Sequence, residues 1–594
     1  MVVNQGHSAL DRHFADLVNR LECDASPELK LAALLVSRHQ ALGNICLPLE
    51  EIADQTLPEG LSGFDRTPKA TPWARKLRKS VMVGVPGEFR PLILDDCNRL
   101  YLRRYWEYEK SLSEEIRARL SAAPPETDPK LSEKGLNRLF AASDETDLQR
   151  VAADRAVRQN FTIITGGPGT GKTRTVVAIL ALLIEQSQRP LRFALAAPSG
   201  KAAARLQEAV LSNMEALDCS QAVRTRMPRN ATTIHRLLGT IPDSPFFRHT
   251  ADHQLLVDVV IIDEASMVDL ALMAKLFAAI PATARVILLG DKDQLTSVEA
   301  GFVLGDICNP PSVAALTDAQ AQLSFSFGAP SPRVRSIQRS IVELQKNYRF
   351  PRESGIYQLV QAVNRGDAER SIVLLKDKSF ADLSWKTVPN ARSIPRYLQQ
   401  SVLSDYKGYL AKSDPAEALE SFGDFRVLCA VRNGPFGTIE LNRLIEEALF
   451  QAKLLHEREQ WYCGRPVMVT RNDYNVRLFN GDIGVTIQDM ESTSEKRVIF
   501  GSAEGGFRRV LPSRLPVHET AFAMTVHKSQ GSEFARALLI LPEKDSPVLT
   551  RELLYTGLTR AREHMEVWAS EGVLREAIAK RVTRSSGLRD AIWG

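Results

Sequence analysis

One short glycine-rich segment constrains this 594-residue chain more than any other feature. Residues 166–173 read GGPGTGKT and match the phosphate-binding pattern G-x-x-x-x-G-K-[ST]. The apolar run 161–165 before this loop is typical of a strand, and residues 175–184 after it are typical of a helix. Glycines let backbone N–H groups surround an anion, and the following helix turns its positive end toward the phosphates. The alternative, a turn that only joins strand to helix, does not explain this context, so the sequence predicts a nucleotide site.

The residues of this loop have separate expected tasks. We expect the Lys172 ammonium group to reach the β- and γ-phosphates of ATP, and the Thr173 hydroxyl to hold Mg²⁺. The residues predicted to contact the nucleotide are Gly166, Gly167, Pro168, Gly169, Thr170, Gly171, Lys172 and Thr173. A phosphate loop alone predicts only an NTP-binding protein.

A pair of acidic residues follows a second buried strand. Residues 259–262 read VVII and lead directly into Asp263 and Glu264. We expect Asp263 to hold Mg²⁺, and Glu264 to orient and deprotonate the attacking water. The alternative, a solvated strand end, is disfavoured because four apolar residues precede the two carboxylates.

Two glutamines are further candidates for the nucleotide site. Gln294 follows the apolar run 285–289 and is a candidate γ-phosphate sensor, although a single glutamine in a loop often has no such task. Gln149 precedes the first strand, where a glutamine that reads adenine would lie. Its position alone leaves a functional and an ordinary structural role equally open.

Short β-rich runs alternate with helical segments from about residue 135 onward, which predicts an α/β protein with parallel sheets. The runs 161–165, 193–197, 257–262 and 285–289 have the composition of strands buried on both faces. The expected order is a helical N-terminal domain (1–120), a linker (121–134), a first lobe (135–340) and a second lobe (341–594). Within these, we expect an insertion without regular period at 311–336 and a small β-barrel-like insertion at about 465–515.

Composition excludes several other classes of protein. No apolar run is long enough to span a bilayer, and the N-terminus lacks the apolar core of a signal peptide, so we expect a cytoplasmic protein. Seven dispersed cysteines argue against a disulfide framework and against a zinc or iron–sulfur site. The net charge of +5 permits a nucleic-acid partner without arguing for one.

Five further segments, in this order, resemble the motifs of superfamily 1 DNA helicases. They are residues 197–205 (APSGKAAAR), 232–238 (TTIHRLL), 344–349 (LQKNYR), 523–533 (AMTVHKSQGSE) and 555–562 (YTGLTRAR). The resemblance implies two RecA-like lobes with ATP between them, and Arg349 and Arg560 as arginine fingers from the second lobe. It also implies DNA contacts by Ser199, Lys201, Thr232 and His235 in the first lobe and by Arg432, Thr525, His527 and Lys528 in the second. For each DNA candidate, a solvated or core role is equally open.

Three segments narrow the resemblance to the RecD family, the α subunits of exodeoxyribonuclease V (RecBCD): residues 10–14 (LDRHF), 101–106 (YLRRYW) and 298–301 (VEAG). This resemblance implies a 5′-to-3′ single-stranded DNA translocase and helicase acting in double-strand-break repair and in degradation of linear DNA. It implies RecB-like and RecC-like partners, DNA ends as substrates, an SH3-like fold for the small β insertion, and a nuclease on another subunit.

Other functions are weighed against this interpretation. A free-standing helicase of the same superfamily would lack the two partners, and a helicase of this type could also act on RNA. A nucleotide-dependent switch would not need the motifs around His527 and Arg560. A DNA-binding scaffold with an inactive ATP site is disfavoured by Lys172, Asp263 and Glu264.

Two segments outside the motifs have expected roles. We expect residues 1–120 to dock a partner chain. The interval 241–256 is long enough only for a short β-hairpin, which suits a pin that separates the two DNA strands.

Overall fold

The computed structural model describes residues 6–594 except 23–25, 59–63, 141–146, 243, 311–331, 388–389, 413, 474, 490–494 and 502–505. Most of the insertion expected at 311–336 therefore lies outside the described residues, and only its end is seen, in α15 (Pro332–Ser340). No helix in the described part of the chain is long and apolar enough to cross a membrane.

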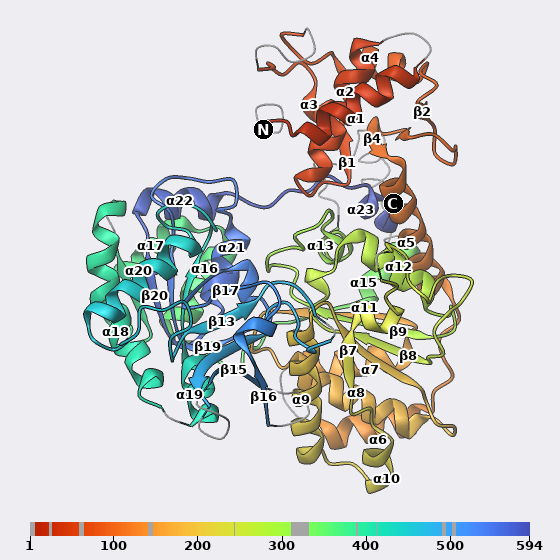
Figure 1. Cartoon of the computed structure of the whole chain (residues 1–594). Helices are drawn as coiled ribbons and strands as arrows, with labels where there is room; N and C mark the ends of the chain where they lie inside the picture. The colour runs from red at the N-terminus through yellow and green to blue at the C-terminus, as the bar shows by residue number, and fades with distance from the viewer. Residues whose placement is uncertain are drawn as a thin grey trace.

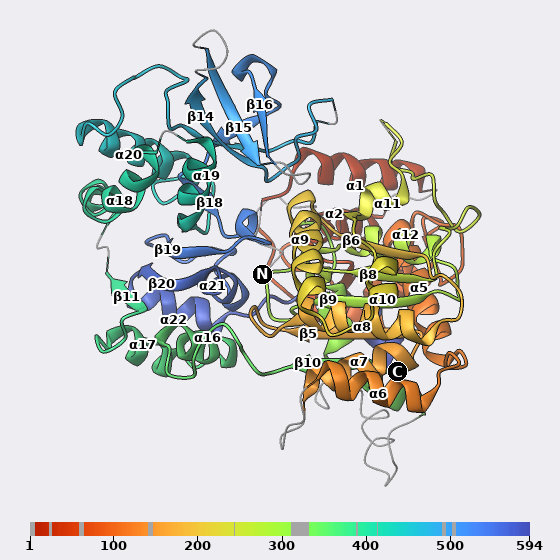
Figure 2. The ribbon, with the colours of Figure 1, turned by 90° about the horizontal axis from the view of Figure 1, so that it is seen from below.

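The first lobe is built on a six-stranded parallel sheet with strand order β10-β5-β9-β8-β6-β7, in which β10, β5, β9, β8 and β6 are labelled in Figure 2. The strands are β5 (Phe161–Gly166), β6 (Phe193–Ala197), β7 (Ala231–Thr233), β8 (Val259–Ile262), β9 (Arg285–Gly290) and β10 (Ile341–Leu344). The four strands predicted from apolar runs are confirmed. β10 pairs with β5, so this sheet extends to Leu344, beyond the expected boundary at 340.

Successive side chains of these strands point to opposite faces, and helices cover both. One face packs against α6 (Pro129–Leu139), α7 (Leu148–Arg158), α8 (Lys172–Gln186), α9 (Gly200–Ala216) and α10 (Gln221–Arg226). The other packs against α11 (Ile234–Leu238), α12 (Leu270–Ala279) and α13 (Val303–Cys308). Ile163 and Ile164, adjacent in β5, belong to the two different hydrophobic clusters.

The second lobe has a five-stranded parallel sheet with strand order β11-β20-β19-β12-β18. The strands are β11 (Leu383–Lys386), β12 (Phe425–Cys429), β18 (Ala523–Thr525), β19 (Phe534–Ile540) and β20 (Ala561–Trp568). One face is covered by α16 (Gly355–Arg365), α17 (Ala368–Lys376), α21 (Arg551–Leu558) and α22 (Glu571–Ala579). The other is covered by α18 (Ile394–Leu410), α19 (Pro415–Asp424) and α20 (Thr438–Gln451).

An antiparallel sheet interrupts the second lobe between β12 and β18, as the sequence predicts. Its strand order is β16-β15-β14-β13-β17, from β13 (Pro466–Val469), β14 (Ile483–Gln488), β15 (Lys496–Gly501), β16 (Phe507–Val510) and β17 (His518–Thr520). Among the described strands, β16 and β17 are edge strands that do not pair with each other, so the described pairing is an antiparallel sheet, and the β-barrel-like form of the insertion stays a prediction.

The N-terminal domain contains a sheet that the sequence interpretation missed. Beside α1 (Ala9–Leu21), α2 (Pro27–Ala41), α3 (Leu49–Ile52) and α4 (Ala70–Leu77) lies a four-stranded sheet of order β1-β4-β3-β2. Its strands are β1 (Cys46–Pro48), β2 (Val83–Gly84), β3 (Leu92–Leu94) and β4 (Arg99–Leu102). Strands of two to four residues are too short to show an alternating pattern, so the expectation of a helical domain was incomplete.

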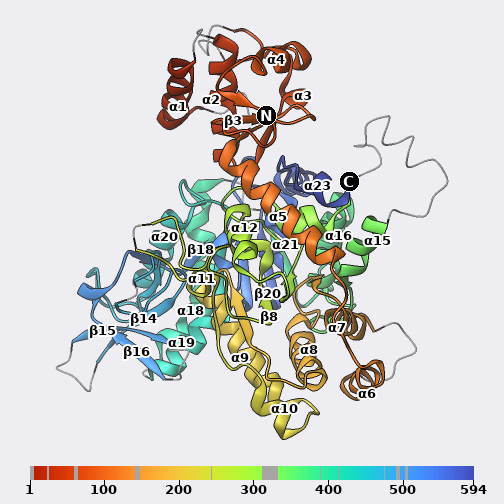
Figure 3. The ribbon, with the colours of Figure 1, turned by 90° about the vertical axis from the view of Figure 1, so that its right-hand side faces the viewer.

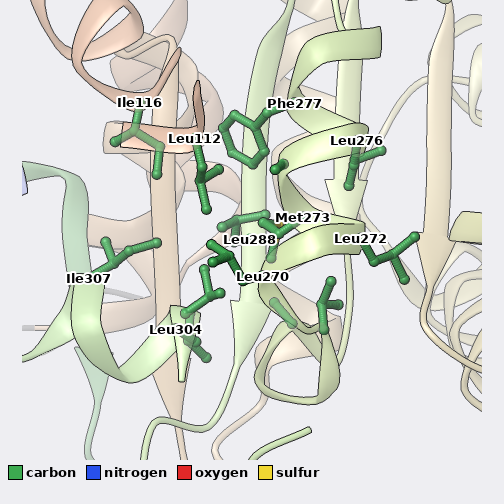
Figure 4. Packing of buried hydrophobic residues seen from close by; sticks show 14 of the residues in the cluster. Leu112, Ile116, Leu270, Leu272, Met273, Leu276, Phe277, Leu288, Leu304 and Ile307 are labelled. Carbon is green, nitrogen blue, oxygen red and sulfur yellow. The ribbon is translucent and has the colours of Figure 1, made fainter. Parts of the chain in front are cut away.

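The long helix α5 (Arg103–Ser121) joins this domain to the first lobe. Its Leu112 and Ile116 are fully buried in the same cluster as Phe277 of α12 (Figure 4). α5 is therefore part of the first lobe's core, although the sequence places a domain boundary at 120. The expected linker 121–134 is shorter as well, because α6 begins at Pro129 and packs against α8.

The C-terminal segment leaves the second lobe and returns to the first. After α22 the chain crosses to α23 (Leu588–Trp593), which packs beside α5 and α13 (Figures 1 and 3). On the way, Arg584 donates hydrogen bonds to the carbonyl oxygens of Ser297 (2.7 Å) and Gly301 (2.8 Å). The range 341–594 is thus not confined to the second lobe.

Candidate nucleotide and DNA sites

The phosphate loop lies between β5 and α8 and needs glycine at several positions. Gly169 and Gly171 both have φ of +81°, a left-handed conformation that other residues adopt at a cost. A Cβ on Gly167 would lie 2.8 Å from the Tyr555 hydroxyl of the second lobe. The Lys172 ammonium group donates hydrogen bonds to the carbonyl oxygens of Gly166 (2.6 Å) and Gly167 (3.1 Å). The lysine therefore lies inside the loop, in contact with its backbone.

A cleft of about 760 Å³ opens beside this loop and is lined by residues of both lobes. Residues 345–348, which follow β10, form one side of this cleft. The Asn347 amide donates to the Pro168 carbonyl oxygen (2.9 Å), and the Tyr348 backbone N–H donates to that of Gly169 (2.8 Å). The size and position of this cleft suit a nucleoside triphosphate whose phosphates enter the loop.

Gln149 lies in the first turn of α7 and lines the same cleft. Its side-chain amide donates a hydrogen bond to the Thr170 carbonyl oxygen (2.9 Å). The structure thus brings Gln149 to the phosphate loop, and its role in reading adenine stays a prediction.

The acidic pair follows β8, whose four residues are all buried. Burial, together with the neighbouring Glu264 carboxylate, raises the pKa of Asp263. Glu264 has a φ of +51°, a left-handed conformation that costs a residue other than glycine on the order of 1 kcal/mol. Its backbone N–H donates to the Asp263 carboxylate (2.9 Å). The donors available here, the Thr173 hydroxyl and the Asp263 carboxylate, are the hard oxygen ligands that Mg²⁺ prefers.

The loop after β9, residues 291–295, carries the second predicted glutamine. Gln294 is buried and its amide donates to the Asp291 carboxylate (3.0 Å). The same oxygen accepts a hydrogen bond from the Tyr555 hydroxyl in α21 (2.9 Å). Burial raises the pKa of Asp291 to about 6. The sensor candidate is therefore held by a buried carboxylate that also contacts the second lobe.

The two predicted arginine fingers both lie at the boundary between the lobes. The Arg349 guanidinium pairs with Glu533 (2.5 Å), and a Cβ on Gly169 would lie 2.5 Å from the Arg349 Cβ. Arg560 is buried and donates to the carbonyl oxygens of Thr556 (2.9 Å) and Ser532 (3.1 Å). Burial lowers the pKa of Arg560.

The Glu264 carboxylate of the first lobe raises the pKa of Arg560, against the effect of burial. The Arg560 guanidinium therefore lies within electrostatic reach of the acidic pair. The second lobe thus presents the Arg560 guanidinium to the first lobe's acidic pair, while Arg349 pairs with Glu533 of its own lobe.

The DNA candidates of the first lobe lie at the carboxyl ends of β6 and β7. The Ser199 hydroxyl caps α9 by accepting from the Ala202 N–H (3.2 Å), which is a structural task. The Lys201 ammonium group donates to the Ser532 hydroxyl of the second lobe (2.6 Å), and burial lowers its pKa to about 7. Thr232 lies on β7 and is partly exposed, and the exposed His235 ring packs against Phe247 at 5.7 Å.

The DNA candidates of the second lobe gather around one carboxylate. Glu519 pairs with Lys528 (2.7 Å) and Arg432 (3.5 Å), and the Thr525 hydroxyl accepts from the Lys528 N–H (3.3 Å). His527 lies in the same turn, where burial lowers its pKa. The structure thus brings the four second-lobe candidates to one place.

A groove of about 520 Å³ runs between α9 and β7 of the first lobe and the antiparallel insertion of the second. The tip of the insertion reaches the first lobe, where the Arg236 guanidinium lies 4.3 Å from the centre of the Phe479 ring. Basic and aromatic side chains line this groove beside the acidic Asp482 and Glu533, among them Lys201, Arg205, Arg236, Arg426, Arg477, Phe479, Phe507 and Arg508. Positive charge with aromatic faces is typical of surfaces that hold single-stranded nucleic acid without sequence preference.

Comparisons with known proteins identify the family. The model of the RecBCD enzyme subunit RecD N-terminal domain matches residues 5–101, an AAA domain matches 149–300, and a UvrD-like helicase C-terminal domain matches 520–567. RecBCD enzyme subunit RecD of Mycolicibacterium smegmatis is 37% identical over 98% of this chain and 96% of its own length. The Mycobacterium tuberculosis protein of that name is 37% identical over 98% and 94%, and that of Haemophilus influenzae 38% over 76% and 73%. The chain belongs to the RecD family.

As a RecD-family protein, the chain is an ATP-dependent DNA helicase of superfamily 1. The sequence-based interpretation of the chain as an ATP-binding helicase of this family is confirmed. The matched AAA domain, residues 149–300, contains the phosphate loop, the acidic pair and both predicted glutamines.

The sequence interpretation missed several residues at the two sites of this RecD-family chain. Asp291 and Tyr555 contact each other across the lobes, Glu533 pairs with Arg349, and Phe479 lies at the insertion tip. Asp291 follows a buried strand directly, as Asp263 does, and that position was a usable signal. For the other three residues, only the folded structure reveals the contact.

Proposed function

We propose that this chain is a 5′-to-3′ motor on single-stranded DNA that uses Mg²⁺–ATP and works with RecB-like and RecC-like subunits. One observation carries the proposal. The same pair of lobes encloses both the nucleotide cleft and the basic, aromatic groove, so opening or closing their interface changes both sites together.

The chemistry follows from the residues beside the phosphate loop. Lys172 would hold the β- and γ-phosphates, and Thr173 and Asp263 would supply oxygen ligands for Mg²⁺. Glu264 orients and deprotonates the attacking water. Arg349 and Arg560 stabilise the charge that develops on the transferred phosphoryl group.

Both arginines belong to the second lobe, so hydrolysis requires the lobes to be together. The contacts that hold the lobes together also join the two sites. Lys201 and Arg205 of the groove bond to Ser532 and Gly531, beside Glu533, which pairs with Arg349 at the nucleotide cleft. A change in the position of the second lobe therefore alters groove and cleft in one movement. Backbone and stacking contacts from the groove would hold the strand without reading its sequence.

The proposed direction rests on the family resemblance and on the loop between α11 and β8. Here the structure corrects the expectation of a β-hairpin, because the described residues of 240–256 form one isolated antiparallel bridge, between Thr240 and Phe247. The loop nevertheless exposes the large apolar side chains of Ile241, Phe246 and Leu256. An apolar loop of this size suits a short pin that separates base pairs at a fork.

Direction is tested with two partly double-stranded DNA substrates. We expect the purified chain with Mg²⁺ and ATP to unwind a duplex that carries a 5′ single-stranded tail. A duplex with a 3′ tail of equal length and sequence should remain intact. The measurement is strand release on a native gel or by fluorescence. Unwinding of the 3′-tailed substrate alone would refute the proposed direction and leave the helicase assignment unaffected.

The proposed partner surface is the N-terminal domain. The RecD N-terminal family model covers residues 5–101, and α1 exposes three leucines on its surface, Leu10, Leu17 and Leu21. Leu10 is 74% exposed and Leu21 59%, which leaves an apolar helix face available for a partner chain. The free-standing alternative predicts that no partner chain binds there.

Two N-terminal deletions separate docking from folding. Removal of residues 1–101 takes Ile45, Ile93 and Tyr101 out of the first lobe's cluster and should lower the melting temperature. The remaining chain should still hydrolyse ATP but no longer co-purify with RecB-like and RecC-like subunits from its own cells. Removal of residues 1–121 should lower the melting temperature much further. That deletion takes α5 away, and with Leu112 and Ile116 alone roughly 3 to 6 kcal/mol of burial.

Melting temperature by differential scanning fluorimetry and co-purification measure the two effects. If the 102–594 chain still co-purifies with the RecB-like and RecC-like subunits, the partner surface lies on the motor lobes. Absence of partners even for the full chain would favour the free-standing alternative.

A further inference from the structure

The loop 291–295 of the first lobe is inserted into the second lobe. Leu295 belongs to the hydrophobic cluster of the second lobe, although it lies only five residues after the end of β9. Its backbone N–H donates to the Thr556 hydroxyl (2.9 Å), and its carbonyl oxygen accepts from the Gln530 amide (2.9 Å). The second lobe therefore holds this loop through the backbone N–H and the carbonyl oxygen of Leu295.

Within this contact, one carboxylate oxygen of Asp291 accepts two hydrogen bonds. The Tyr555 hydroxyl donates to it from the second lobe (2.9 Å), and the Gln294 amide donates to it from the same loop (3.0 Å). Asp291 is 1% exposed and Tyr555 4%, so water does not compete for this oxygen. The other carboxylate oxygen accepts from the Asp293 N–H (3.1 Å).

We propose that Tyr555 is a positioning residue that sets, from the second lobe, how firmly Asp291 holds the Gln294 amide. The inference rests on the proposed role of Gln294 as the γ-phosphate sensor. A buried polar network whose members are all hydrogen-bonded is rigid, and loss of one member loosens the others. When Tyr555 is in place, Asp291 is fixed and holds the Gln294 amide in position, and when the lobes separate Asp291 loses this donor and holds Gln294 less firmly.

The geometry also explains why a tyrosine is needed at this position. The Tyr555 hydroxyl reaches the phosphate loop as well, since a Cβ on Gly167 would lie 2.8 Å from it. One side chain of the second lobe therefore lies close to the loop that binds phosphate and donates to the carboxylate that holds the sensor. Tyr555 thus links lobe position to the sensor without itself touching the reacting atoms.

The test is a double-mutant cycle on ATP hydrolysis with single-stranded DNA present. Tyr555→Phe keeps the ring in the core and removes only the hydroxyl. Asp291→Asn leaves one acceptor oxygen where the two carboxylate oxygens of Asp291 both accept hydrogen bonds. Each is expected to lower kcat about tenfold, the size typical of a hydrogen bond to a charged group, with KM for ATP changed less than about threefold. The double variant should be no more than about twofold slower than the slower single variant, because both act through one contact.

A second readout does not depend on activity. In nucleotide-free protein, hydrogen–deuterium exchange of the backbone amides in 291–295 should be faster in both single variants than in the wild type. Tyr357→Phe is the matched control, a tyrosine of the same cleft that is not among the partners of Asp291, and should leave this exchange unchanged.

The outcomes separate this inference from the proposed function. Multiplicative losses of about a hundredfold in the double variant, or unchanged exchange in 291–295, would overturn the role of Tyr555. A wild-type chain that hydrolyses ATP at the same rate without DNA would instead contradict the motor proposal, and the exchange result would still decide whether Tyr555 holds the loop.

Discussion

Lys172→Gln is expected to reduce ATP hydrolysis by at least about 10² to 10³-fold, the loss typical when one preorganised donor to a developing charge is removed. The Lys172 ammonium group contacts the loop carbonyl oxygens of Gly166 and Gly167 and takes no part in a hydrophobic cluster. Glutamine keeps much of the side-chain length and loses the positive charge. We therefore expect lost turnover with an unchanged fold.

The measurement is steady-state ATPase rate with Mg²⁺ and single-stranded DNA, with far-UV circular dichroism and melting temperature as checks of folding. Lys134→Gln, an exposed lysine on α6, is the matched control and should keep the wild-type rate. A Lys172→Gln protein that hydrolyses ATP at nearly the wild-type rate would show that the nucleotide site is assigned wrongly.

Loss of either arginine finger should act on kcat and much less on nucleotide binding. Arginines that stabilise transferred phosphoryl groups contribute about 10³ to 10⁵-fold in rate, because the charge they meet develops mainly in the transition state. Arg349→Ala and Arg560→Ala should therefore lower kcat strongly, while the dissociation constant of a fluorescent ATP analogue changes only a few-fold.

The surroundings of the two arginines determine which variants are cleanest. Arg560 is buried and bonds to the carbonyl oxygens of Thr556 and Ser532, so Arg560→Ala also leaves buried acceptors without a donor. Arg560→Lys keeps the charge and serves as its control for stability. Arg349→Ala leaves Glu533 with Arg205 at 3.5 Å, so its structural cost is smaller. Equal losses in kcat and in nucleotide affinity would mean that these arginines only hold the ground-state nucleotide.

Local features of the nucleotide site were predictable because each lies within a short segment. The phosphate loop, the strand before it and the helix after it occupy residues 161–186, and Asp263 and Glu264 directly follow their strand. Turn chemistry and apolar runs carry this information over a few residues. The antiparallel insertion was predictable for the same reason, from short strands separated by turns.

Contacts between distant segments could not be predicted in the same way. Asp291 and Tyr555 are 264 positions apart, and a buried aspartate after a strand does not specify which residue will donate to it. The buried face of α5 follows from its apolar spacing, but not that the partner is α12. Segment 121–129 is rich in residues that interrupt helices and strands, so it was a reasonable signal for a domain boundary. The predicted boundary was misplaced because α5, which precedes this segment, packs onto the first lobe.

The central claim is that the chain moves along single-stranded DNA toward the 3′ end at the expense of ATP. Displacement of streptavidin from a biotinylated oligonucleotide measures such movement without any duplex. The account predicts ATP-dependent displacement from a 3′ biotin, little from a 5′ biotin, and none by Lys172→Gln at either end. Displacement from the 5′ biotin alone, or displacement that does not need ATP hydrolysis, would contradict it.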